Sequence, residues 1–144
     1  MIVFDLDGTL SIVGDRLKYL QQTPKNWDAF YAACGEDEVN WPIFDIYKTL
    51  VLNRRPGDVK VVTGRRESCR SKTISWFKEA GIYLRNGHLI MRQDGDKRPD
   101  YIVKHEIVKP FIDKIELVFE DRSSVVAMWR ELGITCCQVA EGEF

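Results

Sequence analysis

The chain has 144 residues, of which 44% are hydrophobic and 30% charged, which is typical of a globular protein large enough for one domain with its own core. The formal net charge of −1 excludes a general basic field for polyanions, so any nucleic-acid contact has to use a local patch. No apolar run is long enough to span a membrane, and no signal segment precedes the first predicted strand. We therefore expect a cytoplasmic protein that does not bind membranes, with one domain over residues 1–144.

The cysteines and histidines do not form a recognisable metal-binding pattern. No Cys-x-x-Cys pair occurs, so a zinc site is not expected, and we interpret the thiols as small buried hydrophobes. His88 and His105 lie far apart in sequence and near no matching ligand set, so we expect both to be structural or surface residues. The four cysteines are Cys34, Cys69, Cys136 and Cys137.

The first apolar run is followed by two aspartates. Residues 1–5 are typical of a buried strand of a parallel sheet, because this short run ends in a turn that contains Gly8. Carboxylates at the carboxyl end of such a strand lie where open α/β sheets bind their ligands. Asp5 and Asp7 therefore indicate a site for a cation such as Mg²⁺, or a carboxylate nucleophile for phosphorus. The plainer interpretation is an acidic turn.

Strands and helices alternate along the rest of the chain, which predicts an α/β fold with a five-stranded parallel sheet. Residues 11–41 are less regular, and we expect them to form an insertion on the substrate side with some helix. The remaining predicted elements are helices over residues 42–51, 68–80, 99–108 and 125–132 and strands over residues 59–62, 89–91, 115–119 and 134–139.

The second predicted strand ends at Thr63, Gly64 and Arg65, and a later helix carries Lys104. Thr63 offers a hydroxyl and a backbone N–H to a phosphate oxygen, while Gly64 gives the backbone room to approach. Lys104 would offset the negative charge between a carboxylate nucleophile and a phosphoryl group. Alone, the first group could be an ordinary strand-to-helix turn, and Lys104 could be a solvated helix lysine.

Two acidic residues, Glu120 and Asp121, end the fourth predicted strand. With Asp5 and Asp7 they form the candidate metal ligands, since carboxylate oxygens suit Mg²⁺ and Mn²⁺ alike. They could instead favour the positive end of the next helix. Together, these features predict phosphoryl transfer: Asp5 would attack phosphorus and form an aspartyl-phosphate, and Asp7 would protonate the leaving oxygen and then deprotonate water.

At these positions the chain resembles a haloacid dehalogenase (HAD) superfamily phosphatase. More narrowly, it resembles the 3′-phosphatase domain of phage-type polynucleotide kinase/phosphatases. The resemblance covers nearly the whole chain and implies a three-layer Rossmann-like sandwich with a minimal cap, a Mg²⁺ cofactor and an aspartyl-phosphate. It rests on residues 4–10 (FDLDGTL), 61–65 (VVTGR), Lys104 and Glu120-Asp121, and for the narrower family on residues 94–96, 103–107, 120–130 and 138–144.

The resemblance also implies substrate contacts and partners. Arg16 and Arg65 fall where the family contacts the phosphate end and the nucleic acid, although Arg16 could be an ordinary exposed arginine. Glu120 stands where the polynucleotide-end enzymes often have aspartate, which puts the metal geometry in doubt. No kinase domain is expected in this chain, so the resemblance admits a separate kinase or ligase partner and a phage-encoded protein in a host cytoplasm.

The leading interpretation is a Mg²⁺-dependent phosphomonoesterase for 3′-phosphorylated DNA or RNA ends. One alternative is a HAD phosphatase for nucleotides or small molecules, and another is a non-catalytic binding module of the same fold. Several basic residues could contact a phosphate backbone and three aromatic residues could stack on a base, although they could equally form a solvated face and a core. These residues are Arg65, Arg66, Arg70, Arg85, Arg92, Lys97 and Arg98, with Trp27, Tyr31 and Trp41.

Overall fold

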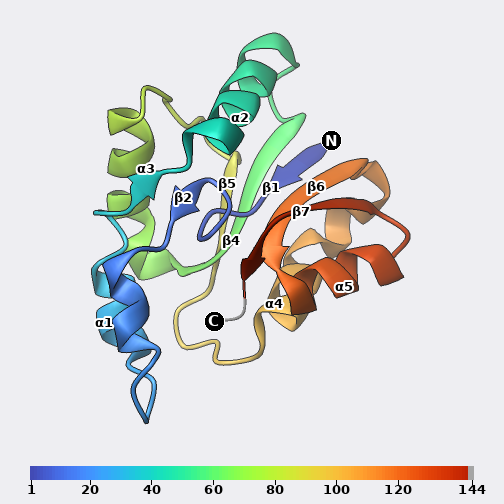
Figure 1. The fold of residues 1–144 in the computed structure, drawn as a ribbon. Helices are drawn as coiled ribbons and strands as arrows, with labels where there is room; N and C mark the ends of the chain where they lie inside the picture. Colours follow the sequence, from blue (N-terminus) through green and yellow to red (C-terminus); the bar gives the residue numbers. More distant parts are fainter. Residues whose placement is uncertain (143–144) are drawn as a thin grey trace.

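A five-stranded parallel sheet forms the centre of the structure, a computed structural model that describes residues 1–142 (Figure 1). The strand order is β5-β4-β1-β6-β7, so the first strand lies in the middle. The predicted α/β fold with five parallel strands is therefore confirmed. The strands are β1 (Ile2–Phe4), β4 (Val59–Arg66), β5 (Leu89–Arg92), β6 (Leu117–Arg122) and β7 (Thr135–Gly142).

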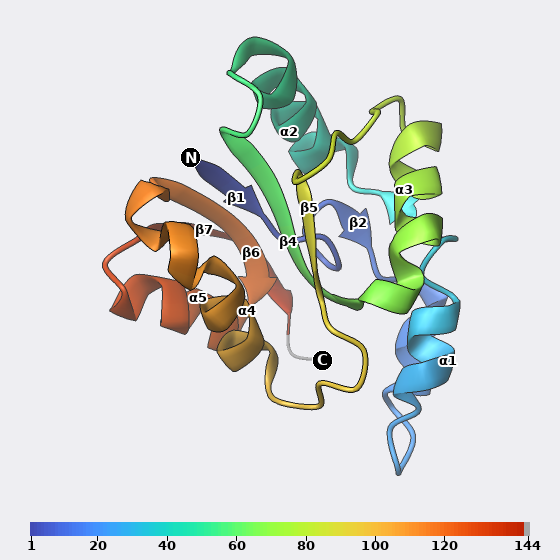
Figure 2. The same ribbon diagram turned by 180° about the vertical axis from the view of Figure 1, so that it is seen from behind.

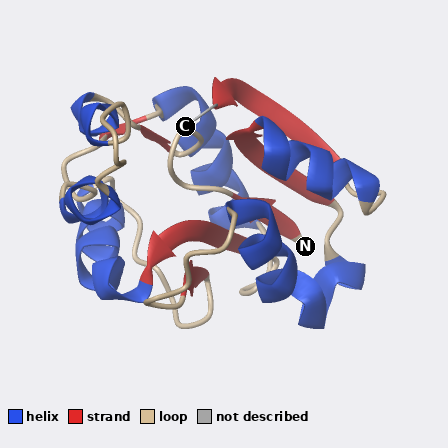
Figure 3. Cartoon of the chain, turned by 90° about the horizontal axis from the view of Figure 1, so that it is seen from below, coloured by secondary structure: helices blue, strands red, loops and turns tan. Residues whose placement is uncertain are grey.

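Helices cover both faces of this sheet and give three layers (Figures 1 and 3). Side chains alternate along β1, so Ile2 and Phe4 enter one core cluster and Val3 enters the other. The first cluster lies under α2 and α3, and the second lies under α4 and α5. These helices are α2 (Trp41–Asn53), α3 (Arg70–Glu79), α4 (Asp100–Val108) and α5 (Ser123–Glu131).

The segment between β1 and α2 forms a small unit at the carboxyl end of the sheet. Strands β2 and β3 pair as an antiparallel ribbon. Helix α1 begins after Asn26, whose side chain accepts a hydrogen bond from the Ala29 N–H. Figure 2 shows α1 and the loop after β5 at this same end of the molecule. The elements of the segment are β2 (Ser11–Ile12), a 3₁₀ helix (Asp15–Tyr19), α1 (Trp27–Ala32) and β3 (Glu38–Val39).

Strands β4, β6 and β7 each extend well past their predicted ends. β4 continues past Thr63 to Arg66, because its pairing with β5 resumes after a register shift. β6 begins at Leu117 rather than at residue 115, because Ile115 is the C-cap of the preceding 3₁₀ helix (Lys109–Lys114). Cys137 is exposed, unlike the other three thiols, so the expectation of a buried cysteine is wrong there. No helix within residues 1–142 is both long and apolar enough to cross a membrane.

Candidate active site

The candidate site lies at the carboxyl end of β1, where the order of the strands in the sheet reverses. β4 pairs with one side of β1 and β6 with the other, which makes this the switch point at which open α/β sheets bind ligands. Asp5 follows β1 directly, Thr63 and Gly64 belong to β4, and Glu120 and Asp121 belong to β6. All five line one small cavity, so residues far apart in sequence meet at one edge.

Lys104, from α4, is the cation at the centre of this edge. Its Nζ atom lies 2.6 Å from Asp5 Oδ1, 2.7 Å from Glu120 Oε2 and 3.3 Å from Asp100 Oδ2. The side chain is almost completely buried. Burial alone would lower the pKa of Lys104, but the three carboxylates raise it well above its ordinary value. Lys104 is therefore held charged beside Asp5.

Asp5, Glu120 and Asp121 form a compact set of buried oxygen donors. One oxygen from each carboxylate lies within 4.8 Å of the others. Burial, followed by repulsion between the neighbouring carboxylates, raises the pKa of each group to about 7. One ammonium does not balance three acids, whereas a divalent cation with a preference for oxygen would. The donor set therefore fits Mg²⁺.

Asp7, which the sequence places among the metal ligands, directs its carboxylate to two arginines instead. Arg65 donates to Asp7 Oδ1 from Nε at 2.8 Å and from Nη2 at 2.5 Å, and Arg16 donates from Nη2 at 2.5 Å. Burial alone would raise the pKa of Asp7, but Arg65 and Arg16 lower it to about 2. Asp7 is thus held ionised by the two arginines.

Both arginines were expected to contact substrate, but they are buried beneath Asp7. Arg16 is 4% exposed and Arg65 is fully buried. Two buried guanidinium groups need more than one carboxylate, and Asp37 supplies the second. It accepts from Arg16 Nε at 2.6 Å and from Arg65 Nη2 at 2.8 Å. Sequence reasoning missed Asp37, because a single acid in a turn carries no periodic signal.

Asp100, the first residue of α4, is a second acid that sequence reasoning missed. Arg92 Nη2 donates to Asp100 Oδ1 at 2.9 Å, and Arg122 Nη1 lies 3.6 Å from Oδ2. These cations and Lys104 lower the pKa of Asp100 despite its burial. Asp100 precedes Lys104 by four residues, the helical spacing of an ion pair, and this signal could have revealed it.

Thr63 and Gly64 connect the site to its surroundings. Thr63 Oγ1 accepts from the Arg65 N–H at 3.1 Å. The Gly64 carbonyl accepts from the Tyr31 hydroxyl and from Arg92 Nε, both at 3.1 Å. A Cβ atom at Gly64 would collide with the Asp100 carboxylate, so the absence of a side chain is a packing requirement here. Tyr31 thereby attaches α1 to the strand that carries Thr63.

The family profile described as the polynucleotide kinase PNKP phosphatase domain matches residues 1–144. The chain belongs to this family. It is a HAD-type phosphatase domain, as the resemblance predicts.

Relatives of this PNKP phosphatase domain occur in larger proteins. A protein of Autographa californica nuclear polyhedrosis virus, provisionally named bifunctional polynucleotide kinase/RNA ligase, is 27% identical over 136 residues. The match covers 92% of this chain and 18% of the viral protein. The chain therefore spans less than a fifth of that relative.

Two solved structures share the fold. One is described as the structure of the Pnkp1/Rnl/Hen1 RNA repair complex, with a TM-score of 0.80 and 30% identity, covering 99% of this chain and 43% of that one. The other, described as the structure of the Pnkp1/Rnl/Hen1 complex, has a TM-score of 0.74 and 32% identity, covering 99% and 46%. The chain thus spans less than half of each matched chain.

Proposed function

We propose that residues 1–144 act as one domain that removes 3′-phosphates from polynucleotide ends through an aspartyl-phosphate. The observation that carries this proposal is the placement of Asp5 at the end of the central strand, 2.6 Å from the Lys104 ammonium. Asp7, two residues later, is held by its own pair of arginines. One carboxylate is thus paired with a lysine near candidate metal ligands, and the other is fixed in direction by two arginines.

In the proposed mechanism, Asp5 attacks phosphorus and the bond to the 3′-oxygen breaks. Asp7 gives a proton to the departing oxygen and then takes one from the water that hydrolyses the aspartyl-phosphate. The second role suits an ionised carboxylate. For the first role, Asp7 has to gain a proton when the phosphate monoester binds. Lys104 and Thr63 would stabilise negative charge on the transferred group.

Mg²⁺ is part of the proposal, and the residues that would hold it are Asp5 and Asp121, with Glu120 beside them. A divalent cation there would add positive charge where the phosphoryl oxygens gather. Glu120 also accepts from Lys104 at 2.7 Å and from the Arg122 N–H at 3.3 Å. We therefore assign Glu120 mainly to positioning Lys104, and Asp121 to the cation.

We infer the substrate and partners of this domain from what its relatives are described as doing. A polynucleotide kinase/RNA ligase and an RNA repair complex favour RNA ends as the first substrate to test, with DNA ends second. Because the matched proteins are longer than this chain, we propose that kinase and ligase activities are supplied by separate proteins or segments.

The test is phosphate release in the presence of Mg²⁺ from a 3′-phosphorylated oligonucleotide, the same strand phosphorylated at its 5′ end, and a 3′-mononucleotide. Selective release from the 3′-phosphorylated oligonucleotide, lost in Asp5→Asn, would support the proposal. Release mainly from the mononucleotide would assign the protein to nucleotide metabolism instead. An Asp5→Asn variant with full activity would contradict the assignment of Asp5 as the nucleophile.

A further inference from the structure

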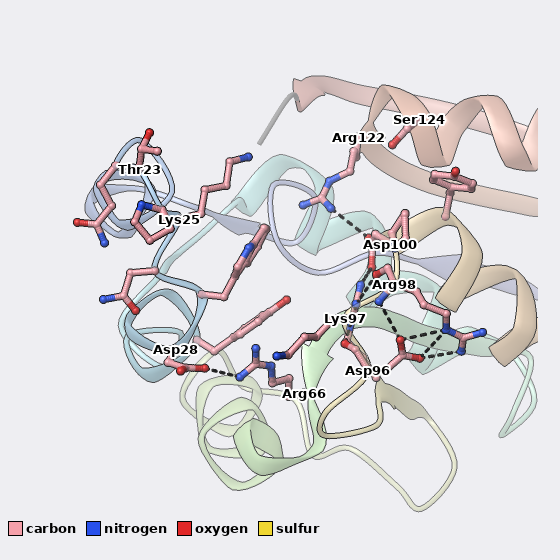
Figure 4. Close-up of a pocket in the computed structure, with 18 residues that line it drawn as sticks. Thr23, Lys25, Asp28, Arg66, Asp96, Lys97, Arg98, Asp100, Arg122 and Ser124 are labelled. Carbon is pink, nitrogen blue, oxygen red and sulfur yellow. Dashed lines mark hydrogen bonds and ion pairs between the residues drawn. The ribbon is translucent and has the colours of Figure 1, made fainter.

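A cleft of about 960 Å³ lies beside the catalytic cavity, and the mechanism above does not use it (Figure 4). Residues 22–28 and Tyr31 form one wall, and residues 96–101 form much of the other. In Figure 4, Lys25 and Asp28 lie across the opening from Lys97 and Arg98. Four residues line both the cleft and the catalytic cavity, so the cleft leads directly to the reaction centre. They are Trp27, Tyr31, Asp100 and Arg122.

The charge of the cleft is opposite to that of the whole chain. Six of its lining residues are Lys or Arg and three are Asp, whereas the formal charge of the chain is −1. The three acids each pair with an arginine of the same lining, namely Asp28 with Arg66, Asp96 with Arg98, and Asp100 with Arg92. Lys25 and Lys97 are both exposed toward anionic groups in the cleft, and the Lys25 Nζ atom lies 5.8 Å from the centre of the Trp27 ring.

An aromatic surface lies where the cleft meets the catalytic cavity. The Trp27 and Tyr31 rings are stacked, with centroids 6.0 Å apart and an interplanar angle of 26°. The Arg66 guanidinium lies 5.0 Å from the centre of the Tyr31 ring, and the Tyr31 hydroxyl donates a hydrogen bond to the Gly64 carbonyl. Trp27 remains partly exposed. A fixed flat ring next to a basic groove is the arrangement with which proteins hold single-stranded nucleic acid.

We propose that this cleft binds the last nucleotides of a single-stranded 3′ end. The terminal base stacks on Trp27, and the preceding backbone phosphates lie beside Lys25 and Lys97. A duplex is disfavoured, because the cleft has the size of a small-ligand pocket rather than of a double helix. This inference rests on the proposed function, since it takes the terminal phosphate to lie beside Asp5.

The first test measures equilibrium binding, so it does not depend on turnover. A 5′-fluorescent hexanucleotide with a 3′-phosphate is titrated with the full chain without Mg²⁺, and so is the same strand lacking its terminal base. Trp27→Ala should raise Kd for the intact strand about five- to 150-fold, the effect of losing one base–aromatic stack. It should have little effect on the strand without the base, and Trp27→Phe should restore most of the binding.

Tyr83→Ala removes an aromatic ring that is more exposed than Trp27, 76% accessible and outside the cleft, and should leave both Kd values unchanged. If Trp27→Ala weakens binding of both oligonucleotides equally, Trp27 only supports the fold of α1, and the proposal is overturned. Equal affinity for a blunt 3′-phosphorylated duplex would overturn it too. Binding with the predicted base dependence but without hydrolysis would reject the proposed function and keep the cleft assignment.

The second test concerns the lysines. For each phosphate contact to a single strand that is lost, the slope of log Kd against log salt should fall by about 0.7. Lys25→Gln should therefore reduce the slope by that amount, whereas Lys78→Gln, an exposed lysine on α3 outside the cleft, should not. An unchanged slope in Lys25→Gln would contradict the predicted path of the backbone.

Discussion

Arg65 lies beneath Asp7, with its Nε and Nη2 atoms 2.8 and 2.5 Å from the Asp7 Oδ1 atom. The two residues are 58 positions apart in the sequence, and Arg65 is completely buried. Asp37 contacts the same guanidinium, with its Oδ2 atom 2.8 Å from Nη2. The direction of the Asp7 carboxylate is therefore set by the folded interior.

Arg65→Lys tests whether this geometry matters for the reaction. Lysine keeps the positive charge but replaces the planar fork by a single ammonium, so Asp7 would stay ionised and lose its fixed direction. We expect kcat to fall about 100-fold, the effect of misplacing a catalytic group by about 1 Å. Arg70→Lys changes a more exposed pair with Glu67 and should alter kcat little. Equal kcat values in the two variants would contradict a positioning role.

Asp100→Asn tests the role of the buried carboxylate at the first position of α4. Asparagine can still accept the hydrogen bond from Arg92, but it removes a negative charge from the group that holds Lys104. We expect kcat to fall at least about tenfold, because the Lys104 ammonium would shift within its remaining ion pairs. The midpoint of urea unfolding should fall less than in Asp100→Ala, which leaves buried cations without a partner. Full activity in Asp100→Asn would show that Asp100 serves stability alone.

Gly8→Ala tests the position of Asp121. A Cβ atom at Gly8 would collide with the Asp121 carboxylate, and the backbone φ of +91° already disfavours a side chain. We expect the Mg²⁺ concentration for half-maximal activity to rise at least about tenfold, since Asp121 is a proposed ligand. Gly57→Ala is the matched control, because Gly57 has φ of +94° but open space around it. Gly57→Ala should lower only stability, by about 1 kcal/mol. An unchanged requirement for Mg²⁺ in Gly8→Ala would argue against Asp121 as a ligand.

The raised pKa values of the acidic cluster predict how stability depends on pH. Asp5, Glu120 and Asp121 have pKa values of about 7 in the folded protein, against ordinary values of 3.8, 4.5 and 3.8. Between about pH 4 and pH 7 the folded state therefore binds more protons than the unfolded state, and stability falls as the pH rises.

Thermal unfolding measured in EDTA should accordingly give a lower Tm at about pH 7 than at about pH 5. Added Mg²⁺ should raise Tm more at the higher pH, because the cation needs ionised ligands. The pKa of Asp7, about 2, affects stability only below this window. The Asp121→Asn variant should show a smaller increase with Mg²⁺. If Mg²⁺ raises Tm by the same amount at both pH values, the cation binds away from these three carboxylates.

The central elements and much of the site could be predicted from the sequence, because the signals are local. Asp5 follows one apolar strand, Glu120 and Asp121 lie near the end of another, and parallel strands bring their carboxyl ends to one edge. Lys104 could be placed only by its order in the chain and by the family resemblance. The proximity of Lys104 to Asp5 depends on how α4 packs, and no sequence pattern reports it.

Arg65 and Arg66 show where such reasoning fails. The two neighbours were expected to belong to one basic surface, but side chains alternate along β4, so Arg65 enters the interior and Arg66 faces the cleft. Trp41 was grouped with Trp27 as a possible stacking residue, yet it lies 52% exposed at the start of α2, outside the cleft. The expected features of residues 143 and 144 lie outside the described part of the chain.

The most direct test of the account places two substrates in one tube: an oligonucleotide with a 3′-phosphate and the same sequence with a 5′-phosphate. The products are followed with Mg²⁺ and then after EDTA, for the native chain and for Asp5→Asn. We predict that only the 3′-phosphate is removed, that EDTA stops the reaction and that Asp5→Asn is inactive. Equal loss from both ends, or release that survives Asp5→Asn, would contradict an aspartyl-phosphate mechanism directed at 3′ ends.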